Sequence, residues 1–484
     1  MSAALALEPV QPRDDDLLEV LRPKTLLIAC ALSAVFAVAS LHNLGRPILL
    51  LVVAAGCVVA ILSPQKAFVL CVFLFAFRND AFAIGPLKIA DPLLAVTAAS
   101  WLVHALLQGR VRLHFSLVIV GLYLSVGILS GLSAQWTTYY ALEAMRWGYV
   151  VLIYWLALQM MGSREVLHAT VKAFMAAGLV MAVCSLGGLA DKFVLHGDGQ
   201  PFLELAGRFG MKSIAVDPLR VSSFMIFPMM LVAGLQQRAA TPSARRIAGL
   251  LFWLGFLTCL LSFSRSSFLQ ILPALTVMWL LTSKHLRKLL LIVGAVLFAL
   301  VAVAFMNPSN PLVKQYGLQR WAIAGKLASE HAEPREVIWA AALKAFEQNP
   351  LTGIGLNNFL PRYFEFRDPW LASGWIYWNQ KATHSTYMEA LVNTGLLGLA
   401  CCLLMMGYFV VLGWKVARQA RADGDLVRYL IAAAAVAAFA GQIVGGIALD
   451  LLSHNHVWII MATLAVLDRY RRPQAGTAAS LTAV

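Results

Sequence analysis

The chain has 484 residues, of which 60% are hydrophobic and only 13% are charged. Soluble domains carry roughly 25% charged residues, so this composition excludes an ordinary soluble protein and indicates one polytopic bundle of membrane-spanning helices. The formal net charge of +14 would suit a nucleic-acid partner, but the basic residues fall in short segments between apolar runs. Such segments set the orientation of a membrane protein, so we predict membrane lipids, and no nucleic acid, as partners.

The apolar runs, taken in chain order, predict an all-α polytopic membrane protein with about 12–14 transmembrane helices. Residues 1–24 precede the first run, and their acidic stretch at Asp14, Asp15 and Asp16 is unlike a signal peptide. We interpret them as a cytoplasmic tail. The candidate spans are residues 25–41, 47–62, 67–84, 93–107, 116–133, 143–161, 169–189, 223–236, 247–261, 267–282, 289–306, 387–413, 427–447 and 455–468.

Two of these spans, 67–84 and 93–107, are separated by the charged segment "FRNDAFAIGPLKIADP". Charges at this position favour broken or re-entrant segments as the alternative to two complete spans.

Basic clusters occur in alternate loops, and the positive-inside rule predicts that these loops are cytoplasmic. They are residues 109–112, 236–246, 283–288, 415–428 and 468–473. The loops that must then face outward are 190–222, 262–267, 307–386 and 449–458. We therefore divide the chain into the tail 1–24, a transmembrane bundle 25–306 with the outer loop 190–222, a large outer loop 307–386, C-terminal transmembrane helices 387–468 and a cytoplasmic tail 469–484.

The large outer loop contains one clear amphipathic helix. Pro334 suits a first helical position, and apolar residues then recur at helical spacing until "NPLTG" ends the run. Gly353 and Gly355 follow, and "GIG" favours a tight turn over a phosphate-binding loop. The next stretch, "PWLASGWIYWNQ", is rich in aromatic residues. It fits an interfacial belt, a platform on which sugar rings stack, or both.

Three motifs in order resemble the O-antigen ligase and Wzy-type polymerase superfamily of bacterial membrane glycosyltransferases. They are "LSFSRSSFL" at 261–269, "REVIWAAALKAFEQNPLTGIGLNNF" at 335–359 and "THSTYMEALVNTGLLGL" at 383–399. The resemblance covers about 205–400, less than half of the chain.

The resemblance implies a fold like that of the GT-C glycosyltransferases and an active site on the periplasmic side of the bacterial inner membrane. It implies transfer of a glycan from an undecaprenyl-diphosphate carrier to an acceptor hydroxyl, without a metal. By motif position, Arg265 and Arg335 would hold the donor diphosphate, His384 would be the base or orient the acceptor, and Arg220 would be a further family arginine. Other polysaccharide-assembly proteins are further expected partners.

The residue types suit this chemistry. Guanidinium groups match phosphate oxygens with a fixed fork of donors, and the outer loops hold no DxD-type acidic pair that would bind a metal against a diphosphate. We therefore predict no metal and no cofactor. Histidine titrates near working pH and suits removal of a proton from the acceptor. Further predicted substrate contacts are Arg208, Lys212, Tyr387, Glu389, Trp375 and Trp378.

Structural roles remain the alternatives. Arg265 at the edge of a span could be an interfacial side chain that reaches to the headgroups. Arg335 lies at a helix start, where the dipole disfavours a cation unless a phosphate binds there. His384 could cap the helix that follows it, and Glu389 could orient His384 or face solvent.

A second polar cluster, "DLLSHNH" at 450–456, lies on the same predicted side. Its two histidines are at i and i+2 and do not share a helix face, so a metal site, a substrate contact and a loop or capping role all remain open. Arg146 with Glu143 forms a charged pair near the outer end of a span.

Polymerase and ligase activities are the two alternatives within the resemblance. We favour a polymerase of exopolysaccharide or O-polysaccharide repeat units, because the aromatic outer loop could hold a growing chain. A ligase would transfer the glycan to lipid A core or a protein. A lipid-linked oligosaccharide flippase is less consistent with the sequence, because mid-span charges are few and no internal repeat is evident.

Overall fold

The computed structural model describes residues 45–77, 88, 90–108, 111–193, 218–239, 241–261, 265–282, 292–296, 299, 334–367, 380 and 382–470. The named elements in this part of the chain are α-helices and short 3-10 turns, with no β-strand. They are α2 (Gly45–Leu62), α3 (Pro64–Leu74), η3 (Phe75–Phe77), α4 (Ala90–Gln108), α5 (Ser116–Leu129), η5 (Ser130–Ser133), α6 (Thr137–Met160), α7 (Arg164–Phe193), α8 (Pro218–Arg238), α9 (Pro242–Leu261), α10 (Arg265–Thr282), α15 (Pro334–Phe346), α16 (Phe359–Phe366), α18 (Thr386–Ala422), α19 (Leu426–Gly445) and α20 (Asn455–Arg469).

Among the described residues, 7 helices are long and apolar enough to cross a membrane, and three shorter apolar helices accompany them. The predicted all-α polytopic class is therefore confirmed. The predicted span 25–41 and most of 289–306 lie outside the described residues, so the count of 12–14 stays a prediction. Helix α3 has 11 residues, too few to cross a bilayer alone, as expected for a broken segment.

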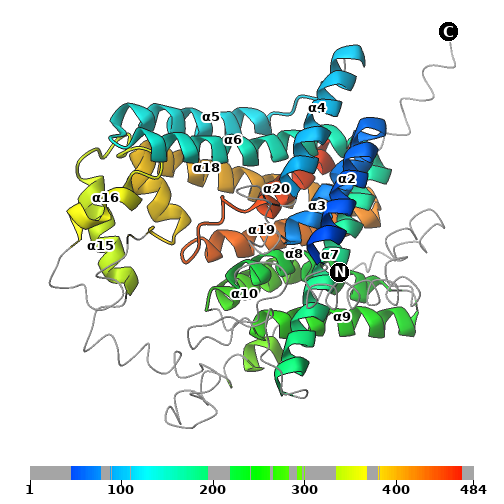
Figure 1. Cartoon of the computed structure of the whole chain (residues 1–484). Helices are drawn as coiled ribbons and strands as arrows, with labels where there is room; N and C mark the ends of the chain where they lie inside the picture. Colours follow the sequence, from blue (N-terminus) through cyan, green and yellow to red (C-terminus); the bar gives the residue numbers. More distant parts are fainter. Residues whose placement is uncertain are drawn as a thin grey trace.

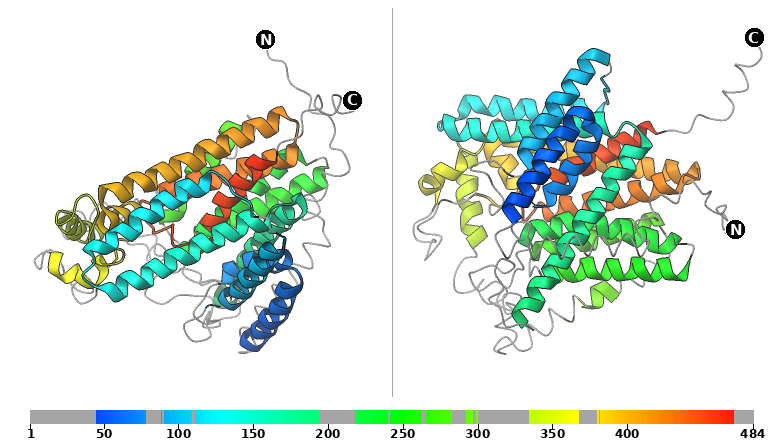
Figure 2. Two further views of the ribbon diagram at one scale, coloured as in Figure 1. Left: turned by 90° about the horizontal axis from the view of Figure 1, so that it is seen from above. Right: turned by 45° about the vertical axis from the view of Figure 1, so that its right-hand side comes forward.

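Helices α5, α6 and α18 run side by side, with α15 and α16 at one end of them (Figure 1). Helices α2, α3 and α4 are steeply inclined to α5 and α6, which is clear in the right panel of Figure 2. Helix α19 lies at the centre of the bundle, and nearly all of its residues are buried. Its small residues explain this position: a Cβ added at Gly441 would lie 2.4 Å from the carbonyl oxygen of Gln270 on α10, so α10 and α19 approach closely.

One end of the bundle is rich in basic residues. Its contacts join Arg112 to Gln159, Arg164 to Asp425, Lys415 to Asp468, Arg421 to Leu281 and Arg469 to Leu158. The predicted cytoplasmic segments 109–112, 415–428 and 468–473 thus meet here as far as they are described.

The opposite end gathers segments that were predicted to face outward. The start of α15, the segment before α18 and the loop from α19 to α20 meet there, as the contacts described below show. We call this the polar end. Which end faces which side of a membrane stays a prediction.

The amphipathic helix predicted in the outer loop is α15, which begins at Pro334 as expected. Its apolar face does not rest on the main bundle core. It packs with α16 and with Val392 of α18 in a small separate core that includes Ile338, Ala342 and Phe359. This second core fixes α15 and α16 to the first turns of α18.

Candidate functional site

Four helix starts meet around the end of α19 and the loop at residues 446–454, which we call the α19–α20 loop. On α8, the Ser223 hydroxyl donates to Gln442 Oε1 at 2.8 Å. On α10, Gln270 packs so closely that a Cβ at Gly445 would lie 2.3 Å from its side chain. Two further starts, those of α15 and α18, contact the α19–α20 loop directly.

Helix α15 reaches this loop through Arg335, whose Nη2 donates to the carbonyl oxygen of Ala448 at 3.3 Å. Helix α18 reaches it through Ser385 and Thr386. The backbone N–H of Thr386 donates to Gly446 O at 2.8 Å, and the Thr386 hydroxyl donates to Leu449 O at 2.7 Å. The α19–α20 loop therefore connects two of the motifs that the sequence singled out.

His384 lies directly before α18, with an exposed side chain and a backbone φ of +53°. This left-handed conformation is uncommon for a residue other than glycine, and such strain persists only where the surroundings determine it. The strained backbone of His384 therefore indicates that contacts made by neighbouring residues hold His384 in place.

The neighbours of His384 supply that constraint. Trp339 Nε1 donates to the carbonyl oxygen of Thr383 at 2.9 Å, and the Thr383 hydroxyl donates to Glu389 Oε2 at 2.6 Å. Ser385 is the N-cap of α18 and accepts a hydrogen bond from the Met388 N–H. Three elements, namely α15, α18 and the α19–α20 loop, therefore hold the backbone on both sides of an exposed imidazole.

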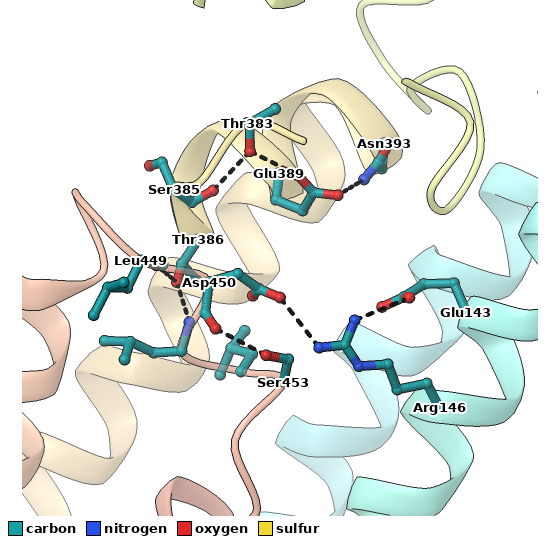
Figure 3. A network of polar contacts seen from close by, with 12 residues as sticks. Glu143, Arg146, Thr383, Ser385, Thr386, Glu389, Asn393, Leu449, Asp450 and Ser453 are labelled. Carbon is teal, nitrogen blue, oxygen red and sulfur yellow. Dashed lines mark hydrogen bonds and ion pairs between the residues drawn. The ribbon is translucent and has the colours of Figure 1, made fainter. Parts of the chain in front are cut away.

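Glu389 does not simply face solvent. Its carboxylate accepts from Thr383 and, at 2.6 Å, from Asn393 Nδ2 (Figure 3). It contacts the residue next to His384, so the predicted orienting role of Glu389 would act through the backbone of Thr383. The Tyr387 hydroxyl donates to Ile443 O at 2.5 Å, which ties α18 to α19, and its predicted substrate contact stays a prediction.

The "GIG" segment is a turn, as predicted, with φ of +71° at Gly353 and +99° at Gly355. It is joined to a bend in α18 at Gly395, whose φ is 68° and ψ is −166°. The bend frees carbonyl groups of α18, and the N–H groups of Ile354 and Gly355 donate to the carbonyl oxygens of Val392 and Asn393 at 3.0 and 3.1 Å.

The reverse bonds complete this contact. The N–H groups of Leu396 and Leu397 donate to the carbonyl oxygens of Pro350 and Leu351. We call this two-way contact the glycine interlock. Because the N–H groups of Ile354 and Gly355 already have backbone partners, these two are not available to bind a phosphate.

Arg146 on α6 connects to the same region. Its guanidinium lies 3.3 Å from Glu143, as the sequence predicted, and 3.7 Å from Asp450 of the α19–α20 loop (Figure 3). Sequence analysis missed the partnership with Asp450, since no local pattern links residues so far apart. It also missed the bond from Trp339 to Thr383 and the glycine interlock.

The remaining predicted residues are placed only in part. Arg265 is the first residue of α10 and Arg220 is the third residue of α8; only the backbone of these two is described. Both helix starts lie at the polar end. Arg208, Lys212, Trp375 and Trp378 lie outside the described residues.

The second polar cluster is largely buried. His456 Nε2 lies 2.9 Å from the Ser223 hydroxyl, and the rings of His454 and His456 are 5.4 Å apart between centroids. Within the described part of the chain, no group of three or more His, Cys, Asp or Glu residues is arranged to hold a metal ion.

A comparison with protein families gives a match in the second half of the chain. Residues 250–403 match the family model described as O-Antigen ligase. This segment is similar to the O-antigen ligase family. The matched range contains all three motifs, from the start of α10 to the bend of α18. The chain is therefore a glycosyltransferase-type enzyme of polysaccharide assembly, and its domain family implies a lipid-linked glycan donor and a glycan acceptor. A comparison with curated proteins gives no match.

Proposed function

We propose that the chain polymerises exopolysaccharide or O-polysaccharide repeat units on the periplasmic face of the bacterial inner membrane. It transfers the glycan from an undecaprenyl-diphosphate carrier to an acceptor sugar hydroxyl, without a metal. The observation that carries the proposal is the exposed imidazole of His384, held in a strained backbone at the end of the bundle where four helix starts meet.

The helix starts support the donor part of the proposal. The N-terminus of a helix bears roughly +0.5 of a charge, and its free N–H groups favour anions. Arg220, Arg265 and Arg335 each lie in the first turn of such a helix, where a cation is disfavoured by the dipole alone. A diphosphate at the polar end would interact favourably with both the dipoles and the guanidinium groups.

His384 supports the acceptor part. A base must lie within hydrogen-bond reach of the hydroxyl it deprotonates, and a positioned base contributes typically 10²–10⁴-fold to the rate. An exposed side chain on a fixed backbone meets this need, because the acceptor can reach the imidazole while the imidazole stays in place. As the proton leaves, the anomeric carbon bonds to the acceptor oxygen and the undecaprenyl diphosphate departs with its bonding electrons.

Transfer in proteoliposomes tests the proposal. The protein is supplied with an undecaprenyl-diphosphate-linked glycan in the presence of EDTA, and His384→Ala, Arg265→Ala and Arg335→Ala are compared with wild type. Lys344→Ala is the matched control for Arg335→Ala, because Lys344 is an exposed cation in the last turn of the same helix. We expect lengthening of the lipid-linked glycan by wild type and Lys344→Ala, and a loss of at least 100-fold in His384→Ala.

The other candidates give different products. Glycan found on lipid A core or a protein, with no lengthening, would establish the ligase. Movement of the donor across the bilayer without transfer would establish a flippase and contradict the proposal. Normal transfer by His384→Ala would refute the assignment of the base.

A further inference from the structure

A pocket beside the first turns of α18 is lined by polar side chains that the proposed donor site does not use. It lies between α5, α6, α18 and the α19–α20 loop, and its volume is about 430 Å³ counted with its open mouth. Most of this space is open to solvent, so the pocket admits the edge of a ligand and not a whole sugar ring. We call it the acidic pocket, and its polar lining includes Glu143, Arg146, Thr386, Glu389, Asn393, Asp450 and Ser453.

Carboxylates outnumber cations in this lining. Arg146 is the one cation among the lining residues, and its guanidinium lies 3.3 Å from Glu143 and 3.7 Å from Asp450. Glu389 contributes the third carboxylate (Figure 3). The one guanidinium already lies against two carboxyl groups, and carboxyl oxygens accept hydrogen bonds well from hydroxyl groups, so this lining suits a hydroxyl better than a diphosphate.

Asn393 gives an independent indication of a ligand. Its side chain is only 3% exposed, and its amide nitrogen donates to Glu389 at 2.6 Å. Its amide oxygen, also buried, has no hydrogen-bond partner. A buried acceptor without a donor is unfavourable, and each such group in a native structure needs an explanation. A hydroxyl group of a ligand in the pocket would supply the missing donor.

The apolar part of the lining includes a stacked pair of aromatic rings, of which Tyr123 is buried. Tyr123 and Trp147 stack with ring centroids 4.7 Å apart and an interplanar angle of 27°, and both line the pocket. Aromatic rings suit the apolar faces of sugars, and carboxylate or amide groups beside them suit the hydroxyls. Phosphate recognition would need the opposite balance of charge.

The acidic pocket and the proposed donor site lie on different sides of the bundle. Helix α5 packs on α18, while α8 and α10 pack on α19. Figures 1 and 2 show α5 and α6 on one side of α18 and α19, and α8, α9 and α10 on the other. His384 precedes α18, so a substrate in the acidic pocket would approach it from the α5–α6 side.

We propose that the acidic pocket binds the hydroxyl-bearing edge of a neutral acceptor sugar, with Glu143, Asp450 and Asn393 accepting its hydrogen bonds. The proposal rests on the proposed function and adds the direction from which the acceptor enters. The donor diphosphate binds the arginines at the helix starts, and the acceptor sugar donates hydrogen bonds to the pocket on the α5–α6 side. The two substrates therefore bind to different groups on different sides of α18.

Sugar binding tests this without relying on transfer. The probes are methyl glycosides of glucose, galactose, mannose and N-acetylglucosamine, measured by saturation-transfer NMR on the detergent-purified protein. We expect at least one glycoside to bind wild type and to remain bound when inorganic pyrophosphate is added. Loss of one hydrogen bond to a charged group weakens binding about tenfold or more, and we expect this weakening in Glu143→Gln and Asp450→Asn.

Asp423→Asn is the matched control, because Asp423 is also paired with an arginine, Arg428, but at the opposite end of the bundle. Asp450→Glu should restore binding in part. Thermal unfolding of each variant separates lost binding from lost folding. If Asp450→Asn does not fold, the binding test rests on Glu143→Gln alone.

Three results would overturn the inference: no glycoside bound by wild type, displacement of the glycoside by pyrophosphate, or unchanged binding in both variants. The transfer assay above is read separately. If wild type transfers no glycan, the proposed function fails. If wild type transfers glycan but the variants bind glycosides normally, only the acidic pocket assignment fails.

Discussion

Gly395 at the bend of α18 offers the sharpest test of how the candidate site is held. Its φ of 68° and ψ of −166° lie in a region that is essentially restricted to glycine. A Cβ at this position would lie 2.3 Å from both the carbonyl carbon and the oxygen of Leu351. Gly395→Ala therefore meets a backbone conformation that alanine avoids and a neighbour that is itself backbone.

The expected cost follows from these two effects. A non-glycine residue in such a region costs about 1–3 kcal/mol, and forcing an added methyl group into packed surroundings costs about 1–3 kcal/mol more. We expect Gly395→Ala to lower the free energy of unfolding by about 2–6 kcal/mol. Gly353→Ala should behave alike, because its Cβ would lie 2.3 Å from the carbonyl carbon of Asn393.

Gly407→Ala is the matched control. Gly407 lies in the same helix with nothing within 4 Å of an added Cβ, so alanine should be neutral or stabilising by up to about 1 kcal/mol. The assay is thermal unfolding in detergent followed by size-exclusion chromatography, with glycan transfer measured in parallel. Equal melting of Gly395→Ala and Gly407→Ala would refute the reasoning, as would full additivity of Gly353→Ala with Gly395→Ala, since both break one interlock.

The remaining predictions concern the surroundings of His384. His384→Asn should fold as well as wild type, because asparagine tolerates a positive φ, and should lose transfer by about 10²-fold or more; thermal unfolding and transfer rates check both. Trp339→Phe removes the bond to Thr383 and should cost about 1 kcal/mol with a fall in the transfer rate but not in donor KM. Tyr387→Phe removes the bond to Ile443 and should cost about as much, and it should raise the acceptor KM if Tyr387 is the predicted substrate contact; an unchanged acceptor KM would refute that contact. Transfer should be equal in EDTA and in added Mg²⁺, and dependence on Mg²⁺ would contradict the metal-free mechanism.

The sequence predicted the helices well because their signal is local. The apolar runs at 47–62, 267–282 and 427–447 correspond closely to α2, α10 and α19, since a bilayer demands a continuous apolar segment of fixed length. Pro334 and the turn at "GIG" were predicted for the same reason, because proline and glycine act through their own backbone.

The partners of the candidate site were not predictable in this way. Ser223 and Gln442 are 219 positions apart, and Trp339 and Thr383 are 44 apart. Neither pair leaves a periodic signal, because the contact is set by how helices pack and not by spacing along the chain. The sequence also treated Asp450 and its neighbours as a separate cluster, whereas the structure brings Asp450 to Arg146 beside the His384 segment.

The glycine interlock sets the boundaries for exchanging parts between related enzymes. Residues 350–355 and 392–397 share four backbone hydrogen bonds across two chain segments, and each presents a glycine where the other leaves no room for a side chain. Grafting a foreign outer loop alone would replace residues 350–355 but keep residues 392–397, so the two segments of the glycine interlock would no longer match. A chimera designed to change the glycan should therefore carry 334–397 as a single block, with one seam at the start of α15 and the other in α18 beyond the bend.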